Sequence, residues 1–138
     1  MKNNIRILIV EDDIISKNLM LAILNPYAEC DVANNGKEAM EKFKEALEAG
    51  KPFDLMCLDI MMPEKNGHEV LKEVREYEEQ KGITNINNIT KIIMTTALSD
   101  FKNVAEAFKS QCEGYLVKPI RKEKLLKTIQ ELFPTFEI

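Results

Sequence analysis

Short apolar runs alternate with longer amphipathic stretches along the whole chain. Five of these runs are typical of β-strands, and they lie at residues 5–10, 30–33, 53–59, 92–94 and 114–117. The runs at 5–10 and 53–59 are almost continuously apolar, which is typical of strands that are covered on both faces. The run at 30–33 (CDVA) is the most polar, so we expect it at an edge of the sheet.

Helical periodicity follows each of the five runs. Apolar residues recur at the i, i+3 and i+4 spacing that gives a helix one buried face. They include Ile15, Leu19 and Ile23; Ala39, Phe43 and Leu47; Val70, Val74 and Tyr77; Phe101, Val104 and Phe108; and Leu125, Ile129 and Phe133. Ser99 or Asp100 can cap the fourth helix, and the fifth ends before Pro134 because the residue ahead of a proline avoids the helical region.

This order of elements is a strand followed by a helix, repeated five times. Regular alternation of this kind predicts an α/β fold, in which a five-stranded parallel sheet with right-handed crossovers carries helices on both faces. The polar segment at 82–88 (GITNINN) is longer than a typical helix–strand connection. We expect it to be a tolerated insertion, because nothing in its sequence supports a partner contact.

Composition limits the class of protein further. The 138 residues are 45% apolar and 30% charged, which predicts one globular domain over residues 1–138. The net charge of −4 argues against a general nucleic-acid or membrane-surface binder. No signal peptide and no apolar run near ~18 residues is present, so we expect a cytoplasmic protein. Cys30, Cys57 and Cys112 are typical of buried thiols in a reducing compartment.

Polar side chains stand at the ends of four predicted strands. Glu11 and Asp12 follow the first strand, Asp59 ends the third, Thr96 ends the fourth, and Lys118 follows the fifth. The carboxyl ends of parallel strands open onto one edge of the sheet, and neighbouring strands lie roughly 5 Å apart. We therefore expect these five side chains to converge on one pocket.

This set of side chains suits phosphoryl transfer. Clustered carboxylates repel one another unless a cation joins them, and Mg²⁺ is the usual partner of such oxygen ligands. The sole histidine, His68, has no partner at zinc-ligand spacing. The Lys118 ammonium and the Thr96 hydroxyl suit the oxygens of a phosphoryl group, which leaves Asp59 as a nucleophile of the aspartyl-phosphate type.

Each of these residues also has an ordinary structural interpretation. Residues 11–13 could be an acidic helix start favoured by the helix dipole, and Asp59 could be a simple cap. Thr96 could be an ordinary strand residue, and Lys118 with Pro119 could form a surface turn. Their occurrence together at successive strand ends, in one register, argues against coincidence.

Four segments at these strand ends resemble the receiver domain of two-component response regulators. They are VEDD after the first strand, LDIMMPEKNG after the third, MTTA in the fourth and GYLVKPI in the fifth. The resemblance extends over nearly the whole chain. It implies a flavodoxin-like doubly wound fold with five helices and the strand order 2-1-3-4-5, which the hydrophobic pattern alone does not give.

The resemblance implies a metal site with Asp59 as its reactive member. Asp59 would be the phosphorylated residue, and Glu11 and Asp12, rather than Asp13, would be the acidic pair. These carboxylates and the backbone carbonyl of Met61 would hold Mg²⁺ or Mn²⁺.

It also implies a switch. Lys118 would contact the phosphate, with a cis bond to Pro119. On phosphorylation Thr96 would move toward the phosphate and Tyr115 would turn inward, which would change partner binding at the surface of helix 4, strand 5 and helix 5. Tyr115 could instead be a tyrosine at the rim with its hydroxyl in water.

Two positions bear on the lifetime of the phosphate. Receivers that lose phosphate quickly tend to have polar or acidic side chains two residues after the phosphoacceptor and two after the conserved hydroxyl residue. Met61 and Leu98 stand at these positions and are both apolar, so they cannot orient an attacking water. We therefore predict slow self-dephosphorylation.

The partners implied are a histidine kinase or a histidine phosphotransfer protein as donor and a downstream protein target. Direct DNA binding and membrane contact are not expected, and activation could produce a homodimer. The protein would catalyse only its own phosphorylation and dephosphorylation.

The alternative is a receiver-like interaction module that no longer uses phosphate. An aspartate-nucleophile phosphatase would need an acid in place of Met61, and an FMN carrier would not have the acidic EDDIIS after its first strand.

Overall fold

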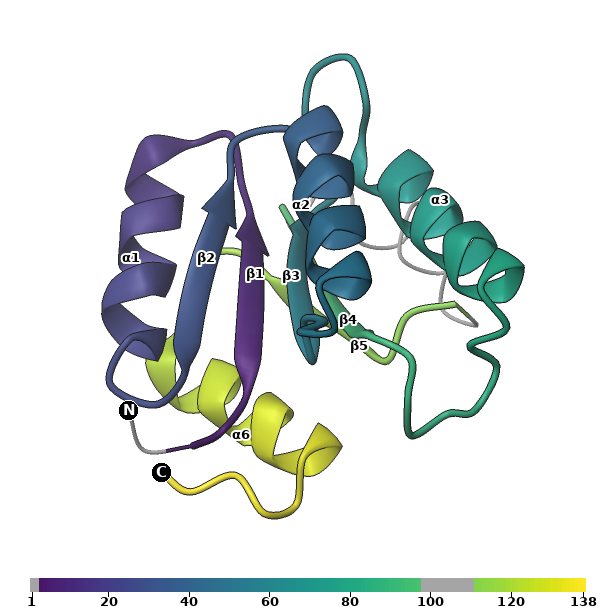
Figure 1. The fold of residues 1–138 in the computed structure, drawn as a ribbon. Coiled ribbons are helices and arrows are strands. Elements are labelled where there is room, and N and C mark those ends of the chain that lie inside the picture. Colours follow the sequence, from purple (N-terminus) through teal and green to yellow (C-terminus); the bar gives the residue numbers. More distant parts are fainter. Residues whose placement is uncertain (1–2, 98–110) are drawn as a thin grey trace.

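The fold is a parallel sheet covered by helices on both faces (Figure 1). It is seen in a computed structural model that describes residues 3–97 and 111–138. The strands are β1 (Arg6–Val10), β2 (Glu29–Ala33), β3 (Leu55–Asp59), β4 (Lys91–Thr96) and β5 (Gly114–Val117). The helices of the described residues are α1 (Ile14–Leu24), α2 (Gly36–Glu48), α3 (Gly67–Gln80) and α6 (Lys122–Leu132).

The sheet has the order β2-β1-β3-β4-β5, and every neighbouring pair is parallel. The predicted topology is therefore confirmed, with the polar strand β2 at an edge. The described residues contain four helices, whereas the sequence predicted five; the one expected to begin at Ser99 or Asp100 falls mainly on residues 98–110, outside the described part. The third strand begins two residues later than predicted, at Leu55.

Alternate residues of each strand fill two separate apolar cores. One core lies between the sheet and helices α2 and α3, and the other lies between the sheet and helices α1 and α6 (Figure 1). Strand residues of the first core include Leu8, Val10, Met56, Leu58, Ile92 and Met94. Those of the second include Ile7, Ile9, Leu55, Cys57, Ile93 and Leu116. This period of two, with both faces buried, explains why the strands are almost continuously apolar.

The three cysteines are free thiols, but only one of them is fully buried. Cys57 lies in the middle of the sheet, and burial raises the pKa of its thiol to about 12. Cys30 and Cys112 are half-buried, so the expectation of buried thiols was too strong for these two.

Strand register brings the carboxyl ends of the central strands into line. Val10 pairs with Leu58, and Leu58 pairs with Met94 on the other side. The residues that follow, Glu11 after β1 and Asp59 at the end of β3, therefore stand at the same level of the sheet. The polar loop at 82–88 joins α3 to the start of β4, so it lies at the amino ends of the strands, opposite Glu11 and Asp59.

A buried charge network holds the two ends of that loop. The Glu78 side chain is 3% exposed and accepts hydrogen bonds from Arg75 Nη1 at 2.8 Å and from the backbone N–H of Thr90 at 2.7 Å. Arg75 Nη2 donates to Glu113 Oε1 at 2.8 Å, and the same oxygen accepts the Ile92 N–H at 2.7 Å. The network ties α3 to the first residues of β4 and to the residue before β5.

We predict that Glu78→Ala lowers the free energy of unfolding by about 2–4 kcal/mol, because it leaves a half-buried guanidinium and a buried N–H with fewer partners. The matched control is Glu79→Ala, which removes an exposed carboxylate from the same helix. Urea denaturation of both variants checks this prediction, and equal losses would contradict it.

Candidate functional site

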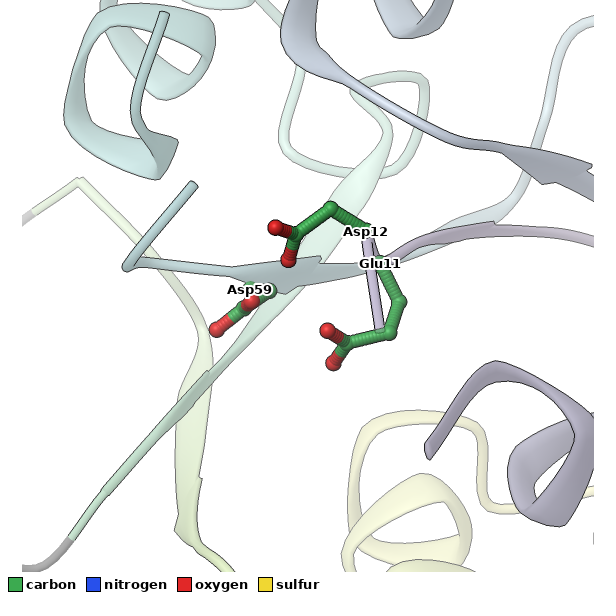
Figure 2. A group of neighbouring side chains, drawn as sticks. All are labelled: Glu11, Asp12 and Asp59. Atoms are coloured by element: carbon green, nitrogen blue, oxygen red, sulfur yellow. The ribbon is translucent and has the colours of Figure 1, made fainter. Parts of the chain in front are cut away.

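Three carboxylates meet at the carboxyl edge of the sheet. Glu11 and Asp12 follow β1, and Asp59 is the last residue of β3. Each offers an oxygen, and these oxygens lie within 4.8 Å of one another. Figure 2 shows the three side chains arranged around a common space. Glu11 and Asp59 are 1% and 3% exposed, whereas Asp12 faces solvent, so the cluster is half-open.

Lys118 supplies the positive charge of the cluster. Its Nζ lies 2.8 Å from Glu11 Oε2 and 3.3 Å from Asp59 Oδ1. Its backbone N–H donates to the carbonyl of Thr96 at 2.7 Å, which fixes the start of its side chain at the end of β4. The peptide bond between Lys118 and Pro119 is cis, as the sequence resemblance implied.

One ammonium does not balance three carboxylates. Burial, followed by the charge of Glu11, raises the pKa of Asp59 to about 7, although Lys118 acts in the opposite direction. Burial acts to lower the pKa of Lys118, but its hydrogen bond to Glu11 and the charges of Asp59 and Glu11 outweigh that effect and raise it. The lysine therefore stays charged at neutral pH. Any further cation near Asp59 would stabilise the ionised form of its carboxyl group.

The hard oxygen ligands of this cluster fit a divalent cation such as Mg²⁺. The three carboxylates are close enough to share an ion, and the exposed side of Asp12 leaves room for the waters that Mg²⁺ retains. The cluster therefore qualifies as a candidate cation site on the chemistry of its donors.

The loop after β3 returns to the backbone of Asp59 at the point where α3 begins. A Cβ at Gly67 would lie 2.5 Å from the carbonyl oxygen of Asp59 and 2.7 Å from Ile60 Cα, so only glycine fits at this start of α3. The Gly67 N–H donates to the Ile60 carbonyl at 2.9 Å. The Met61 N–H approaches Asp59 Oδ1 at 3.3 Å, while the Met61 side chain is 56% exposed at the rim.

The remaining predicted residues surround this centre at different depths. Thr96 is fully buried, and its hydroxyl donates to the Ala97 carbonyl at 3.3 Å. Tyr115 is half-buried and packs against the apolar core beneath α2 and α3. Leu98 lies outside the described residues.

Asp13 has a role that the sequence prediction missed. Its side chain accepts the Ser16 N–H at 2.8 Å and so caps α1, and this hydrogen bond lowers the pKa of Asp13. Its own N–H donates to Glu11 Oε1 at 3.1 Å. Asp13 therefore helps to orient Glu11, and its position just ahead of the helical pattern was the available signal.

Comparison with known families identifies the fold and the site together. The family model described as "Response regulator receiver domain" matches residues 7–130. The chain belongs to this family. Its members are signalling modules of two-component systems, and the acidic pocket of this receiver stands where the family has its phosphoacceptor site.

Two curated relatives show how much of a receiver protein the chain resembles. The regulatory protein VanRB of Enterococcus faecalis is 39% identical over 130 residues, which are 94% of this chain and 52% of VanRB. The chemotaxis protein CheY of Halobacterium salinarum is 31% identical over 128 residues, which are 92% of this chain and 95% of CheY. The chain thus spans about half the length of VanRB and nearly all of CheY.

Solved receiver structures superpose on the whole fold. One contains the Saccharomyces cerevisiae histidine phosphotransfer protein Ypd1 with the receiver domain of Ssk1; the similarity has a TM-score of 0.78 and 30% identity, and it covers 95% of this chain and 90% of that one. Another is the response regulator TrrA of Thermotoga maritima in complex with Mg²⁺-BeF, with a TM-score of 0.70, 30% identity and coverage of 96% and 100%. Within the described part of the receiver, no helix has the length and apolar character needed to span a bilayer.

We predict that the metal-free receiver loses stability as the pH rises from about 4 to above 7, because Asp59 has a higher pKa when folded than when unfolded. Asp59→Asn should remove this contribution and raise the free energy of unfolding at pH 8 by roughly 1–3 kcal/mol. Urea denaturation in chelator at pH 5 and pH 8 measures the effect. Glu41→Gln, an exposed carboxylate on α2, is the control. An Asp59→Asn variant that is no more stable at pH 8 than the parent would contradict the burial of an ionised Asp59.

We predict that Gly67→Ala destabilises the receiver by about 1–3 kcal/mol, because the new Cβ must displace the backbone of Asp59 and Ile60. Gly82→Ala is a useful comparison, since its Cβ meets nothing within 4 Å and only the positive φ of 75° is strained. Thermal denaturation, together with the chemical shifts of the Asp59 amide, separates a local displacement from general unfolding. Unchanged Asp59 shifts in Gly67→Ala would contradict the close approach.

Proposed function

We propose that Asp59 accepts a phosphoryl group from the phosphohistidine of a histidine kinase or a histidine phosphotransfer protein. The observation that carries this proposal is the position of the Lys118 ammonium, 3.3 Å from a nearly buried Asp59 that also lies beside two further carboxylates. The pairing of a phosphotransfer protein with the Ssk1 receiver supports a donor of that kind.

In the proposed step a carboxylate oxygen of Asp59 attacks the phosphorus atom. The P–N bond to the donor imidazole breaks, the electron pair leaves with the imidazole nitrogen, and an acyl phosphate forms. Lys118 faces the oxygens that carry the developing charge, and its raised pKa keeps it protonated there. The Met61 N–H, close to Asp59 Oδ1, helps to orient the attacking group.

The ion we propose is Mg²⁺, with Mn²⁺ as a substitute. Glu11, Asp12 and Asp59 would hold it with their carboxylates, and Met61 with its backbone carbonyl. The presence of Mg²⁺ in the TrrA complex supports an ion of this kind. When bound, the ion offsets the carboxylate charge and the charge of the phosphoryl oxygens. The residues of the chain then keep Asp59 ionised and aligned.

Thr96 and Tyr115 are the residues we propose to report the phosphorylated state. Among the described residues the Thr96 hydroxyl makes one long hydrogen bond, 3.3 Å to the Ala97 carbonyl, so little of it is lost when the hydroxyl turns to a phosphate oxygen. Tyr115 pairs across the sheet with Met94, two residues before Thr96. A movement of Thr96 would therefore reach Tyr115 and the surface of strand β5.

We propose that residues 1–138 act as one cytoplasmic receiver domain that passes its signal to a protein target. The proposal includes no DNA contact by these residues, and a phosphorylation-dependent homodimer is one form the output can take. Catalysis is limited to the receiver's own phosphorylation and dephosphorylation. The alternative is a module that binds partners without phosphate, and it predicts that the acidic cluster is dispensable for signalling.

Incubation with Mg²⁺ and acetyl phosphate should add one phosphoryl group to the receiver, as measured by intact mass. Asp59→Ala should abolish the gain, and chelator should suppress it. Asp54→Asn, which changes a carboxylate at the opposite edge of the sheet, is the control and should react like the parent. No gain with any small donor would favour the phosphate-independent module.

Phosphate loss from Asp59 should be slow because apolar Met61 stands at the rim. Changing Met61→Asn together with Leu98→Glu should speed the loss about tenfold or more, since polar side chains can orient an attacking water. Met61→Leu keeps the rim apolar and is the control. The decay of the phosphorylated mass after removal of the donor measures the rate, and an unchanged decay would refute the role of these positions.

A further inference from the structure

The loop between β3 and α3 follows Asp59 directly, and its two ends are fixed by different contacts. Near its start, Ile60 and Met62 are 1% and 7% exposed and belong to the apolar core beneath α2 and α3. At its end, the Gly67 N–H donates to the Ile60 carbonyl at 2.9 Å. Residues 63–65 lie between these anchors and outside the core, so another contact has to hold them.

The backbone in this middle part of the loop is strained. Glu64 has a φ of 67°, in the left-handed region that a residue with a Cβ atom seldom occupies. The Glu64 side chain is exposed and makes no ion pair or hydrogen bond with the described part of the chain. A strained conformation of this kind persists only where neighbouring residues hold it.

The next residue, Lys65, is held against the start of α2. A Cβ at Gly36, the first residue of α2, would lie 2.7 Å from Lys65 Cγ and 2.8 Å from the Lys65 carbonyl oxygen. The start of α2 is itself fixed, because the Asn35 side chain accepts the Glu38 N–H at 2.8 Å. The loop therefore rests on a capped helix end (Figure 1).

The ammonium of Lys65 ties the same part of the loop to α3. Lys65 Nζ lies 2.6 Å from Glu73 Oε1, and the two side chains are 30% and 38% exposed. A pair with this exposure contributes little to the stability of the whole fold. Because Gly36 contacts the stem of Lys65 and Glu73 binds its ammonium, the two contacts together hold Lys65 between two helices.

We infer that Lys65 is a positioning residue, which holds this loop so that Met61 stays beside Asp59. The Met61 N–H lies 3.3 Å from Asp59 Oδ1, four residues before Lys65 in the chain. The inference deepens the proposed function and rests on it, because the Met61 carbonyl is one of the groups proposed to hold Mg²⁺. Release of Lys65 would let Met61 move away from Asp59 and weaken the binding of the ion.

A purely electrostatic role of the ion pair makes a different prediction. Loss of the Lys65 ammonium removes positive charge and would strengthen the binding of a cation, whereas loss of the Glu73 carboxylate would weaken it. A positioning role predicts that both losses weaken cation binding. The signs of the two effects therefore separate the two explanations.

The test is titration of the receiver with Mg²⁺, followed through its backbone amide signals by NMR, for Lys65→Met and Glu73→Gln. Methionine keeps a stem that can pack on Gly36, and glutamine keeps the shape of Glu73, so each variant removes one charge of the pair. Lys72→Met with Glu76→Gln is the matched control, because it removes an exposed ion pair from the same helix. Lys65→Arg keeps the positive charge and should bind Mg²⁺ as the parent does. All variants should melt close to the temperature of the parent.

We expect each single variant to raise the Mg²⁺ dissociation constant about threefold, which is the contribution of a partly exposed ion pair. Both should also shift the Met61 amide signal before any Mg²⁺ is added, and the control should change neither quantity. Dissociation constants that change in opposite directions or stay unchanged would overturn the inference. So would an unmoved Met61 signal, or a Lys65→Arg variant that binds as weakly as Lys65→Met.

Intact mass after reaction with acetyl phosphate reports the proposed function separately. A parent that gains a phosphoryl group, with single variants that bind Mg²⁺ as tightly as it does, would defeat this inference alone. A parent that gains none, with Mg²⁺ binding that both variants weaken, would defeat the proposed function alone. A parent that binds no Mg²⁺ would overturn both.

Discussion

The structure depends on two carboxylates buried against one ammonium. Glu11 and Asp59 are almost inaccessible, and Lys118 lies within 3.3 Å of both. Burial of a charge is costly unless opposite charge and hydrogen bonds compensate for it, and here the compensation is incomplete. The raised pKa of Asp59 reflects this incomplete compensation of buried charge. A divalent cation, and then a phosphoryl group held by Lys118, would each change the charge balance of the site. The same charge imbalance that makes burial of the carboxylates costly thus makes the site responsive to cations and phosphoryl groups.

The rest of the fold serves to impose this arrangement. Strand register sets Glu11 and Asp59 at the same level, and the hydrogen bond from Lys118 to the Thr96 carbonyl fixes the third partner. Gly67 lets α3 start against the backbone of Asp59. On the opposite edge, the network of Arg75, Glu78 and Glu113 anchors the starts of β4 and β5. Because these contacts link elements on both sides of Asp59, its position is determined by the whole sheet rather than by one loop.

Much of this could be predicted from the sequence, because hydrophobic periodicity is a local property. The parallel sheet, the edge position of the CDVA strand and the convergence of Asp59 with Lys118 all follow from strand–helix alternation. The strand order came from resemblance to receivers, since periodicity does not say which strands are neighbours. The close approach at Gly67, the contact of Asp13 with Glu11 and the Arg75 network depend on distances between segments, which no local pattern encodes. The roles of Thr96, Tyr115 and Leu98 in switching and phosphate loss stay predictions.

The central claim is that the phosphoryl group forms an acyl phosphate on Asp59. Borohydride reduces an aspartyl phosphate to homoserine, so reduction after reaction with Mg²⁺ and acetyl phosphate, followed by peptide mass spectrometry, marks the residue directly. The account predicts homoserine at position 59 alone, and none when the ion is removed by chelator. Homoserine at Glu11, Asp12 or any other position, or unmodified Asp59 in a protein that has gained phosphoryl mass, would contradict it.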